Sequence, residues 1–285
     1  VWVVDTVQGL CKVNPAPAVP SLTACAVLPV GVVPGPPAFD KVGNRVYIPD
    51  TSGTAGILRF TFNTATETVG ASATTATNAN LIAAAPASTA PSALAFGPDG
   101  QLYVAMAGSP NILRVSAPNT GTGAIRSIGT VFTPGSLSMA FTKADLWVAE
   151  PTDIATLSSA TLCAGTCSAS TFPVRLTPTA IASDANFVYV GDGTNIVWRY
   201  DPVAQTLTKL ADTGLAAGVS TPFSAINGLA SDGATRVFVA DASHVWTISG
   251  SSAPQIISVT PPTGVPGTSV AVNITGSGLT GSHLN

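Results

Sequence analysis

The sequence has few charged residues. Only 9% of its 285 residues are Asp, Glu, Lys or Arg, and the formal net charge is −3. A nucleic-acid-binding protein needs an excess of basic residues to neutralise phosphates. The composition therefore excludes an electrostatic nucleic-acid interface. Uncharged Ala, Thr, Ser, Gly and Pro dominate instead, which is typical of secreted and cell-surface proteins.

Residues of the common catalytic machineries are also scarce. The two histidines are His244, next to a predicted turn, and His283, near the C-terminal end, and the only glutamates are Glu67 and Glu150. A single histidine in a turn is more often solvated than catalytic. No G-x-S-x-G nucleophile motif or phosphate-binding glycine loop occurs in a suitable context. The sequence therefore favours a protein that is not an enzyme.

Long hydrophobic runs are missing as well. Apolar stretches such as 81–96 are broken by proline and alternate as strands do, so we expect no membrane span. No signal peptide is visible in the sequence, and Val1 lies directly inside a predicted strand. We therefore expect residue 1 to be an internal or mature start.

A repeated strand pattern is the main feature that is present. In residues 91–115, short apolar runs are separated by a Pro-Asp-Gly turn and a Gly-Ser-Pro turn, which predicts strands joined by hairpins. The second run recurs in six copies at spacings of 45, 56, 44, 42 and 49 residues. Its last residues are Asp5, Asp50, Met106, Glu150, Asp192 and Asp241.

The third run of the unit recurs in the same register. Its copies begin at Leu10, Ile57, Ile112, Ile154, Val197 and Val245. A period of about 40 to 50 residues is that of a four-stranded propeller blade. The sequence therefore predicts an all-β, six-bladed β-propeller over residues 1–250, with one helical patch within 76–90.

The repeat unit resembles the NHL-type six-bladed β-propeller, although gluconolactonase-like and paraoxonase-like propellers have similar blades. Residues 251–285 resemble the start of an IPT/TIG immunoglobulin-like domain. The matching positions are Pro254, Ile256, Ser258, Pro261, Gly264, Gly267, Thr268, Val270, Ile274, Gly276 and Gly278. Such a sandwich needs about 100 residues, so this second segment is expected to be incomplete.

The four cysteines form two local pairs. Cys11 and Cys25 lie on successive predicted strands, and Cys163 and Cys167 close a short loop. We expect a disulfide in each pair and an oxidising location, that is extracellular, cell-surface or periplasmic. The rival interpretation is a metal site of four thiolates, but neither pair has the two-residue spacing of a zinc knuckle.

Carboxylates end the second strand in five of the six copies, at Asp5, Asp50, Glu150, Asp192 and Asp241. One interpretation is a cluster of cation ligands, with calcium as the cofactor. The other is that each side chain accepts backbone N–H bonds in its own turn. We favour the second, because a residue repeated in nearly every blade serves the blade. The basic residues Lys12, Arg59, Arg114 and Arg199, which recur on third strands, are similarly expected to pair within or between blades.

The alternative function is a metal-dependent lactonase or hydrolase, as implied by the resemblance to gluconolactonase-like propellers. Asn227 resembles one of that family's metal-binding asparagines, and Asp192 or Asp241 would be the acidic partner. The glutamate of the family's motif is missing. We therefore expect no catalytic residue and no cofactor, and a scaffold or interaction module that binds proteins or self-associates, such as a subunit of an extracellular filament.

The two ends of the repeat are incomplete. The first copy lacks its first strand and the sixth lacks its fourth. Because an open strand edge invites pairing, we expect Gln255–Thr260 to form the outer strand of the sixth blade. The alternative is that this strand inserts into a neighbouring molecule.

Overall fold

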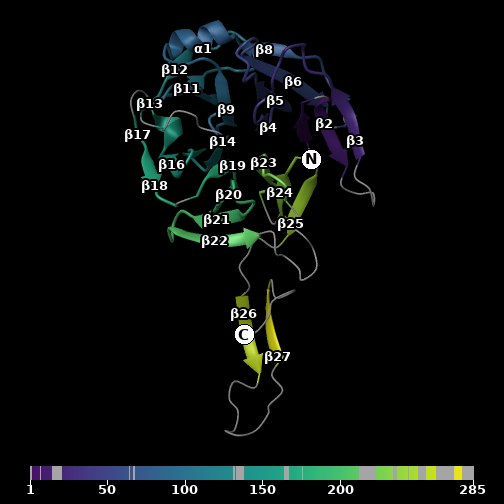
Figure 1. Cartoon of the computed structure of the whole chain (residues 1–285), viewed down its shortest axis with the longest axis vertical. Coiled ribbons are helices and arrows are strands. Elements are labelled where there is room, and N and C mark those ends of the chain that lie inside the picture. The colour runs from purple at the N-terminus through teal and green to yellow at the C-terminus, as the bar shows by residue number, and fades with distance from the viewer. Residues whose placement is uncertain are drawn as a thin grey trace.

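The computed structural model is a six-bladed β-propeller in which the sheets follow one another around a ring (Figure 1). It describes residues 2–6, 8–14, 21–63, 65–66, 68–130, 132, 138–163, 167–174, 176–211, 223–233, 236–242, 244–249, 255–260 and 273–277. The fold is mainly β, as the sequence predicts. Among these residues no helix is long and apolar enough to cross a bilayer.

The first three blades contain the strands β1 to β12. Blade 1 has β1 (Trp2–Asp5), β2 (Gly9–Asn14) and β3 (Ser21–Ala26). Blade 2 has β4 (Ala38–Asp40), β5 (Arg45–Pro49), β6 (Ile57–Asn63), β7 (Thr68–Val69) and β8 (Ala73–Ala76). Blade 3 has β9 (Pro91–Phe96), β10 (Leu102–Met106), β11 (Ile112–Val115) and β12 (Ile125–Ser127).

The remaining blades follow the same antiparallel order. Blade 4 has β14 (Ser138–Thr142), β15 (Asp145–Ala149), β16 (Ile154–Leu157) and β18 (Ser170–Phe172). Blade 5 has β19 (Pro178–Ser183), β20 (Val188–Asp192), β21 (Val197–Asp201) and β22 (Thr206–Ala211). Blade 6 has β23 (Gly228–Ser231), β24 (Arg236–Ala240) and β25 (Val245–Ser249).

Four short elements lie between blade strands. Helix α1 (Asn78–Ala84) connects blades 2 and 3 and falls within the predicted helical patch. Thr77 caps it by accepting a bond from the Asn80 N–H. In blade 4, the 3-10 helix η1 (Ala160–Leu162) precedes β17 (Cys167–Ser168), which pairs in parallel with β13 (Gly129–Thr130).

Cross-strand pairing confirms the alignment of the six copies. In every blade the second residue of the aligned second strand is aromatic, and it faces the aligned third-strand position. The pairs are Trp2 with Lys12, Tyr47 with Arg59, Tyr103 with Arg114, Trp147 with Thr156, Tyr189 with Arg199 and Phe238 with Thr247. Equivalent positions in the sequence therefore occupy equivalent positions in the blades.

The hydrophobic core lies between neighbouring blades. Each cluster of buried side chains combines residues of two successive sheets. The aromatic second-strand residues form part of these contacts, because Tyr47 stacks on Phe96 of blade 3 at 5.8 Å between ring centres. Tyr103 similarly meets Phe141 of blade 4 edge-on at 4.8 Å. Burial of these faces holds adjacent sheets together.

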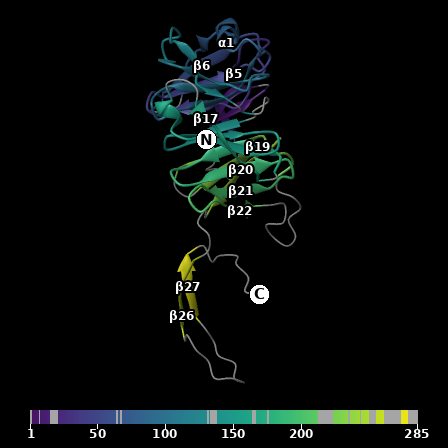
Figure 2. The same ribbon diagram turned by 90° about the vertical axis from the view of Figure 1, so that its left-hand side faces the viewer.

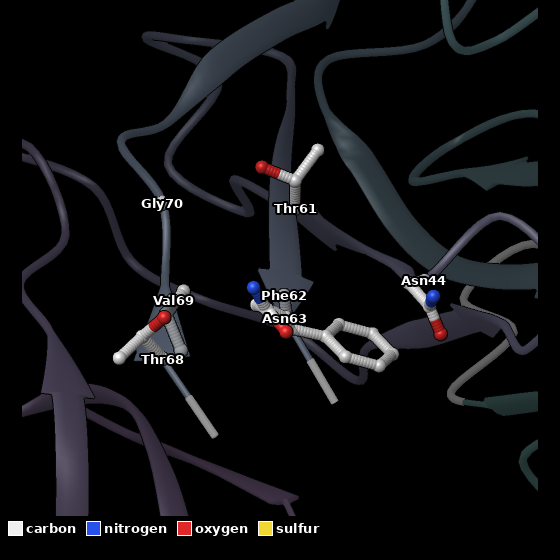
Figure 3. Close-up of a pocket in the computed structure, with 7 residues that line it drawn as sticks. All are labelled: Asn44, Thr61, Phe62, Asn63, Thr68, Val69 and Gly70. Carbon is white, nitrogen blue, oxygen red and sulfur yellow. The ribbon is translucent and has the colours of Figure 1, made fainter. Parts of the chain in front are cut away.

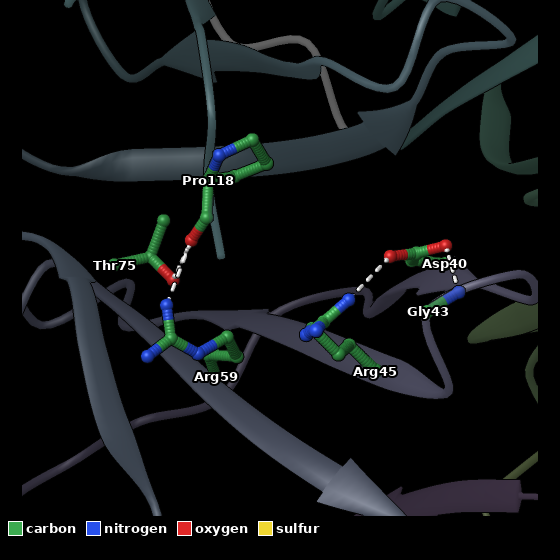
Figure 4. A network of polar contacts seen from close by, with 6 residues as sticks. All are labelled: Asp40, Gly43, Arg45, Arg59, Thr75 and Pro118. Carbon is green, nitrogen blue, oxygen red and sulfur yellow. Dashed lines mark hydrogen bonds and ion pairs between the residues drawn. The ribbon is translucent and has the colours of Figure 1, made fainter. Parts of the chain in front are cut away.

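Third-strand arginines also connect blades. Arg59 of blade 2 donates to the carbonyl of Pro118 in blade 3 at 2.9 Å, and Thr75 donates to the same oxygen (Figure 4). One blade further on, Arg114 donates to the Thr161 carbonyl at 3.4 Å. Arg199 lies over the Phe187 ring of its own blade. The observed contacts are thus of both expected kinds, between and within blades.

The C-terminal segment differs from our expectation. Strand β26 (Gln255–Thr260) pairs with β27 (Asn273–Ser277) in a two-stranded sheet of its own (Figure 2). The prediction that β26 is the outer strand of blade 6 is therefore wrong. The reason is that a second β-forming segment follows in the chain, and local antiparallel pairing uses one edge of β26. Whether residues 251–285 begin an immunoglobulin-like fold stays a prediction.

Candidate functional site

The repeated carboxylates lie where second strands enter the turn to the third strand. Asp50 is fully buried and accepts five hydrogen bonds. Four come from its own turn: the Ser52 N–H and hydroxyl and the N–H groups of Thr54 and Ala55. The fifth comes from Val33 N–H at 3.0 Å, in the segment that arrives from blade 1.

These bonds determine the ionisation of Asp50. Burial by itself raises the pKa of the carboxyl group, but the bonds from Ser52, Ala55 and Val33 outweigh it and lower the pKa below its ordinary value. The carboxylate is therefore held in its charged form although it is buried, because its lone pairs are occupied by donors.

Asp192 has a similar set of donors in blade 5. One oxygen accepts from the Thr194 N–H and hydroxyl and from the Ile196 N–H, at 2.9, 2.6 and 3.0 Å. The other accepts from the Trp198 indole at 2.7 Å. The side chain thus closes the turn and also orients the indole of Trp198.

Asp241 combines both patterns in blade 6. It accepts hydrogen bonds from the His244 N–H at 2.7 Å and from the Trp246 indole at 2.9 Å. Asp192 likewise accepts bonds from its own turn and from a tryptophan. Asp241 also accepts from the Ser224 N–H at 3.3 Å, in the segment that arrives from blade 5. The His244 side chain itself is 63% exposed.

The other two carboxylates occupy the same turn. Asp5 accepts from the Gln8 N–H at 2.7 Å. Glu150 is buried, and its own N–H donates to the Asp153 carbonyl across the turn. In blade 3 the position is Met106, which is buried among apolar side chains. The repeated carboxylates thus occupy one structural position, and Asp50, Asp192 and Asp241 have donors on both oxygens.

The predicted metal ligands do not form a cluster. In the part of the chain that the structure describes, no group of three or more His, Cys, Asp and Glu side chains is arranged to hold a metal ion. Asn227 is exposed, and its N–H donates to the Ala240 carbonyl. Asp192 is bonded within its own blade, and Asp241 is bonded within its blade and to the segment that arrives from blade 5.

Both predicted disulfides are present. Cys11 and Cys25 join β2 to β3 in blade 1. Cys163 and Cys167 join the end of η1 to β17. Because β17 pairs with β13, the second disulfide lies where the segment arriving from blade 3 meets blade 4. No free cysteine occurs among the described residues.

A surface that the sequence analysis did not identify lies between blades 1 and 2. Three valines in residues 27–33, here called the valine connector, are exposed: Val27 by 77%, Val30 by 103% and Val33 by 51%. The connector is anchored to the Asp50 turn by bonds from the Thr51 N–H to the Val33 carbonyl and from the Ser52 hydroxyl to the Gly31 carbonyl. The run of valines between prolines in the sequence is the signal that could have indicated this surface.

Two surface pockets lie toward the outside of blades 2 and 3. The larger, about 420 Å³, is open to solvent and is lined by Thr61, Phe62, Thr68 and neighbouring residues (Figure 3). The second, about 230 Å³, is lined by Gln101, Arg114, Ser116, Ala124 and Arg126. Neither pocket includes a repeated turn carboxylate.

Comparison with known proteins supports the fold. No family model and no curated protein sequence matches the chain. A catalytically inactive histidine-to-alanine variant of virginiamycin B lyase from Staphylococcus aureus, with quinupristin, is similar with a TM-score of 0.51 and 14% identity, over 84% of this chain and 76% of the lyase.

Two further similar structures come from Bacteroides thetaiotaomicron. A protein of unknown function has a TM-score of 0.57 and 14% identity, over 81% of this chain and 61% of its own. The extracellular domain of a hybrid two-component system has a TM-score of 0.51 and 12% identity, over 77% of this chain and 28% of its own. At these identities the likeness shows the fold alone. The class of protein is thus a six-bladed β-propeller.

Proposed function

We propose that this chain is an exported propeller that serves outside the cytoplasm as a scaffold or interaction module, without catalysis. The observation that carries the proposal is the bonding of the repeated carboxylates. Asp50, Asp192 and Asp241 accept five, four and three hydrogen bonds from their own turns, a neighbouring tryptophan or the arriving segment. Their oxygens are used to close turns and, at Asp50 and Asp241, to join the turn to the segment arriving from the preceding blade.

The two disulfides support the location. Disulfides persist in oxidising compartments and are rare in the cytosol. One of the similar propellers is the extracellular domain of a hybrid two-component system, which fits the same setting. We therefore propose that the protein acts at the cell surface, in the extracellular space or in the periplasm.

The valine connector supports an interaction role. Its apolar side chains are exposed. The surrounding sequence is uncharged, since residues 21–39 contain no Asp, Glu, Lys or Arg. The bonds to the Asp50 turn hold this segment in place before any partner binds, which reduces the entropy cost of association. The partner we propose is a second copy of the chain, because a nearly uncharged protein does not repel its own copies.

The proposal also includes the families that the repeat unit and the C-terminal segment resemble. We interpret the blades as NHL-type and residues 251–285 as the beginning of an IPT/TIG domain. In this interpretation the C-terminal segment joins the propeller to a neighbouring module or subunit, and β26 is available to that neighbour along the edge not paired with β27.

The metal-dependent hydrolase is the less favoured alternative. To bind a cation, Asp192 would have to release the Thr194 and Ile196 donors or the Trp198 indole, and Asp241 would have to release Trp246. Removing such bonds from buried groups costs about 1–3 kcal/mol each. The bonding pattern thus favours a structural role for these residues.

The test is self-association measured by sedimentation velocity over a wide range of protein concentrations. We expect the wild-type chain to associate as its concentration rises, and Val30→Lys to prevent this by placing a charge in the apolar contact. Val203→Lys is the matched control, because Val203 is also exposed, by 94%, but lies in blade 5. A wild-type chain that stays monomeric, or two variants with equal effects, would contradict the proposed contact.

A further inference from the structure

One position in blade 3 departs from the pattern of the other blades. The aligned third-strand residue of each blade faces a residue on the next strand outward. The structure describes this facing residue in five blades. It is Thr23 opposite Lys12, Ala73 opposite Arg59, Arg126 opposite Arg114, Ser170 opposite Thr156, and Thr208 opposite Arg199. Four of these neighbours are small and uncharged. Only blade 3 places a second arginine there.

This pairing is unfavourable unless an anion is present. Like charges directly opposite one another on adjacent strands repel and destabilise a sheet. The chain has only 11 basic residues among 285, so the placement is not a consequence of a generally basic surface. A residue repeated around the ring serves the blade, whereas a residue confined to one blade is the kind that forms a site.

The two arginines differ in their contacts. Arg114 donates to the Thr161 carbonyl at 3.4 Å. Arg126 is exposed. Among the arginines that the structure describes, it is the one for which no hydrogen bond, ion pair or ring contact is found. Its donors are therefore available to a ligand.

The pair lines the 230 Å³ pocket together with Gln101, Ser116 and Ala124, and no carboxylate is among the lining residues. Asp99, in the turn before β10, is bonded to the Tyr103 hydroxyl at 3.0 Å and to the Gln101 amide at 3.1 Å. Its oxygens are thus occupied by donors other than the two arginines.

We propose that this pocket, here called the blade 3 arginine pocket, binds a tetrahedral oxyanion with two negative charges, namely an inorganic sulfate or phosphate ion or a phosphate monoester. Guanidinium groups present several N–H donors in a planar fork that fits such oxyanions. Two arginines match the charge of a dianion and remove their own repulsion on binding. The pocket is smaller than the roughly 300–1,000 Å³ of drug-sized sites, which suits one charged group.

The oxyanion has two sources with the same charge and shape: a free inorganic ion, or a phosphate monoester on a larger molecule. The open position of Arg126 at the surface gives an ester-linked group access to the pocket. This proposal does not rest on the scaffold function, because the pocket is in blade 3 and the valine connector lies between blades 1 and 2.

The experiment is a titration of the whole chain, at constant ionic strength, followed by NMR of the arginine side-chain N–H groups. The probes are sodium sulfate, sodium phosphate and glucose 6-phosphate. We expect saturable shifts of the Arg114 and Arg126 signals. Equal binding of glucose 6-phosphate and inorganic phosphate assigns the site to an ester-linked group, whereas binding of the inorganic ions alone assigns it to the free ion.

Three variants separate a site from a general charge effect. Arg126→Ala is expected to weaken binding about tenfold or more, and Arg126→Lys by less, because lysine keeps the charge but not the fork. Arg126→Ala with Val203→Arg restores the net charge at an exposed position of blade 5 that does not face an arginine, and its binding should stay weak. Linear, non-saturating shifts in the wild type, or recovery of binding in the double variant, would overturn the proposal. Unchanged spectra elsewhere in the molecule verify that each variant is folded.

Discussion

The Asp50 carboxylate accepts a hydrogen bond from the Val33 N–H, 17 residues earlier in the chain, at 3.0 Å. Asp241 repeats this relationship with the Ser224 N–H, also 17 residues earlier, at 3.3 Å. In both blades a side chain at the end of the second strand joins its own turn to the segment arriving from the preceding blade. This contact explains how a repeated carboxylate orders the ring.

Replacing Asp50 by asparagine tests the importance of this contact. The amide carries no charge and has one oxygen for the donors that now surround two. We expect Asp50→Asn to lower the free energy of unfolding by about 1 to 3 kcal/mol, measured by denaturant titration. Asp201→Asn is the control, because Asp201 accepts only the Val203 and Ala204 N–H bonds in an exposed turn. Equal losses in both variants would contradict the special role of Asp50.

The low pKa of Asp50 predicts how stability depends on acid. A carboxyl whose pKa is lower in the folded than in the unfolded chain stabilises the fold above the unfolded value of 3.8. That contribution is lost as pH falls through the folded pKa. We therefore expect the stability difference between wild type and Asp50→Asn to shrink as pH is lowered below about 4. A difference that stays constant down to pH 2 would argue against this linkage.

Tyr103 predicts an effect at the alkaline end. Burial, and then its bond to Asp99, raise the pKa of the Tyr103 hydroxyl to about 12. Between pH 10 and 12 the folded chain keeps a proton that the unfolded chain releases, so stability falls as pH rises through this range. The absorbance titration curves of wild type and Tyr103→Phe should differ by the ionisation of one phenol near pH 12. A difference centred near 10 would show that the hydroxyl is not perturbed.

The two disulfides are expected to contribute unequally. Cys11 and Cys25 are 14 residues apart, and Cys163 and Cys167 are 4 apart, so the first restricts the unfolded chain more. Replacing the first pair by alanine should cost about 3 kcal/mol of stability, and replacing the second should cost less. Alkylation before and after reduction verifies the pairing, since the unreduced protein should expose no reactive thiol.

The pairing of β26 with β27 predicts a neutral truncation. Because this hairpin is a sheet separate from blade 6, deleting 251–285 should leave the melting temperature of the propeller within about 1–2 °C of its original value. Differential scanning calorimetry measures this directly. A clear drop would mean that the segment completes blade 6, as we first expected from the sequence.

Much of the fold could be predicted from the sequence, because the deciding features are local. Alternating runs between turn residues predict strands, and the recurrence from Asp5 to Asp241 predicts six blades. The spacing of Cys11 and Cys25, and of Cys163 and Cys167, was enough to predict two disulfides, because each pair is close along the chain. Interactions between near neighbours leave a clear pattern in the sequence.

Contacts between blades were decided only by the tertiary structure. The sequence places a carboxylate after a strand, but not the Val33 or Ser224 N–H that meets it. The Arg114 to Arg126 register depends on how a loop of nine residues, 116–124, aligns β11 with β12. Strand β26 pairs with β27 and not with an edge of blade 6, although both lie near it in the sequence. The partner that a strand or side chain meets depends on the packing of the whole fold, and the pattern of a single segment does not encode it.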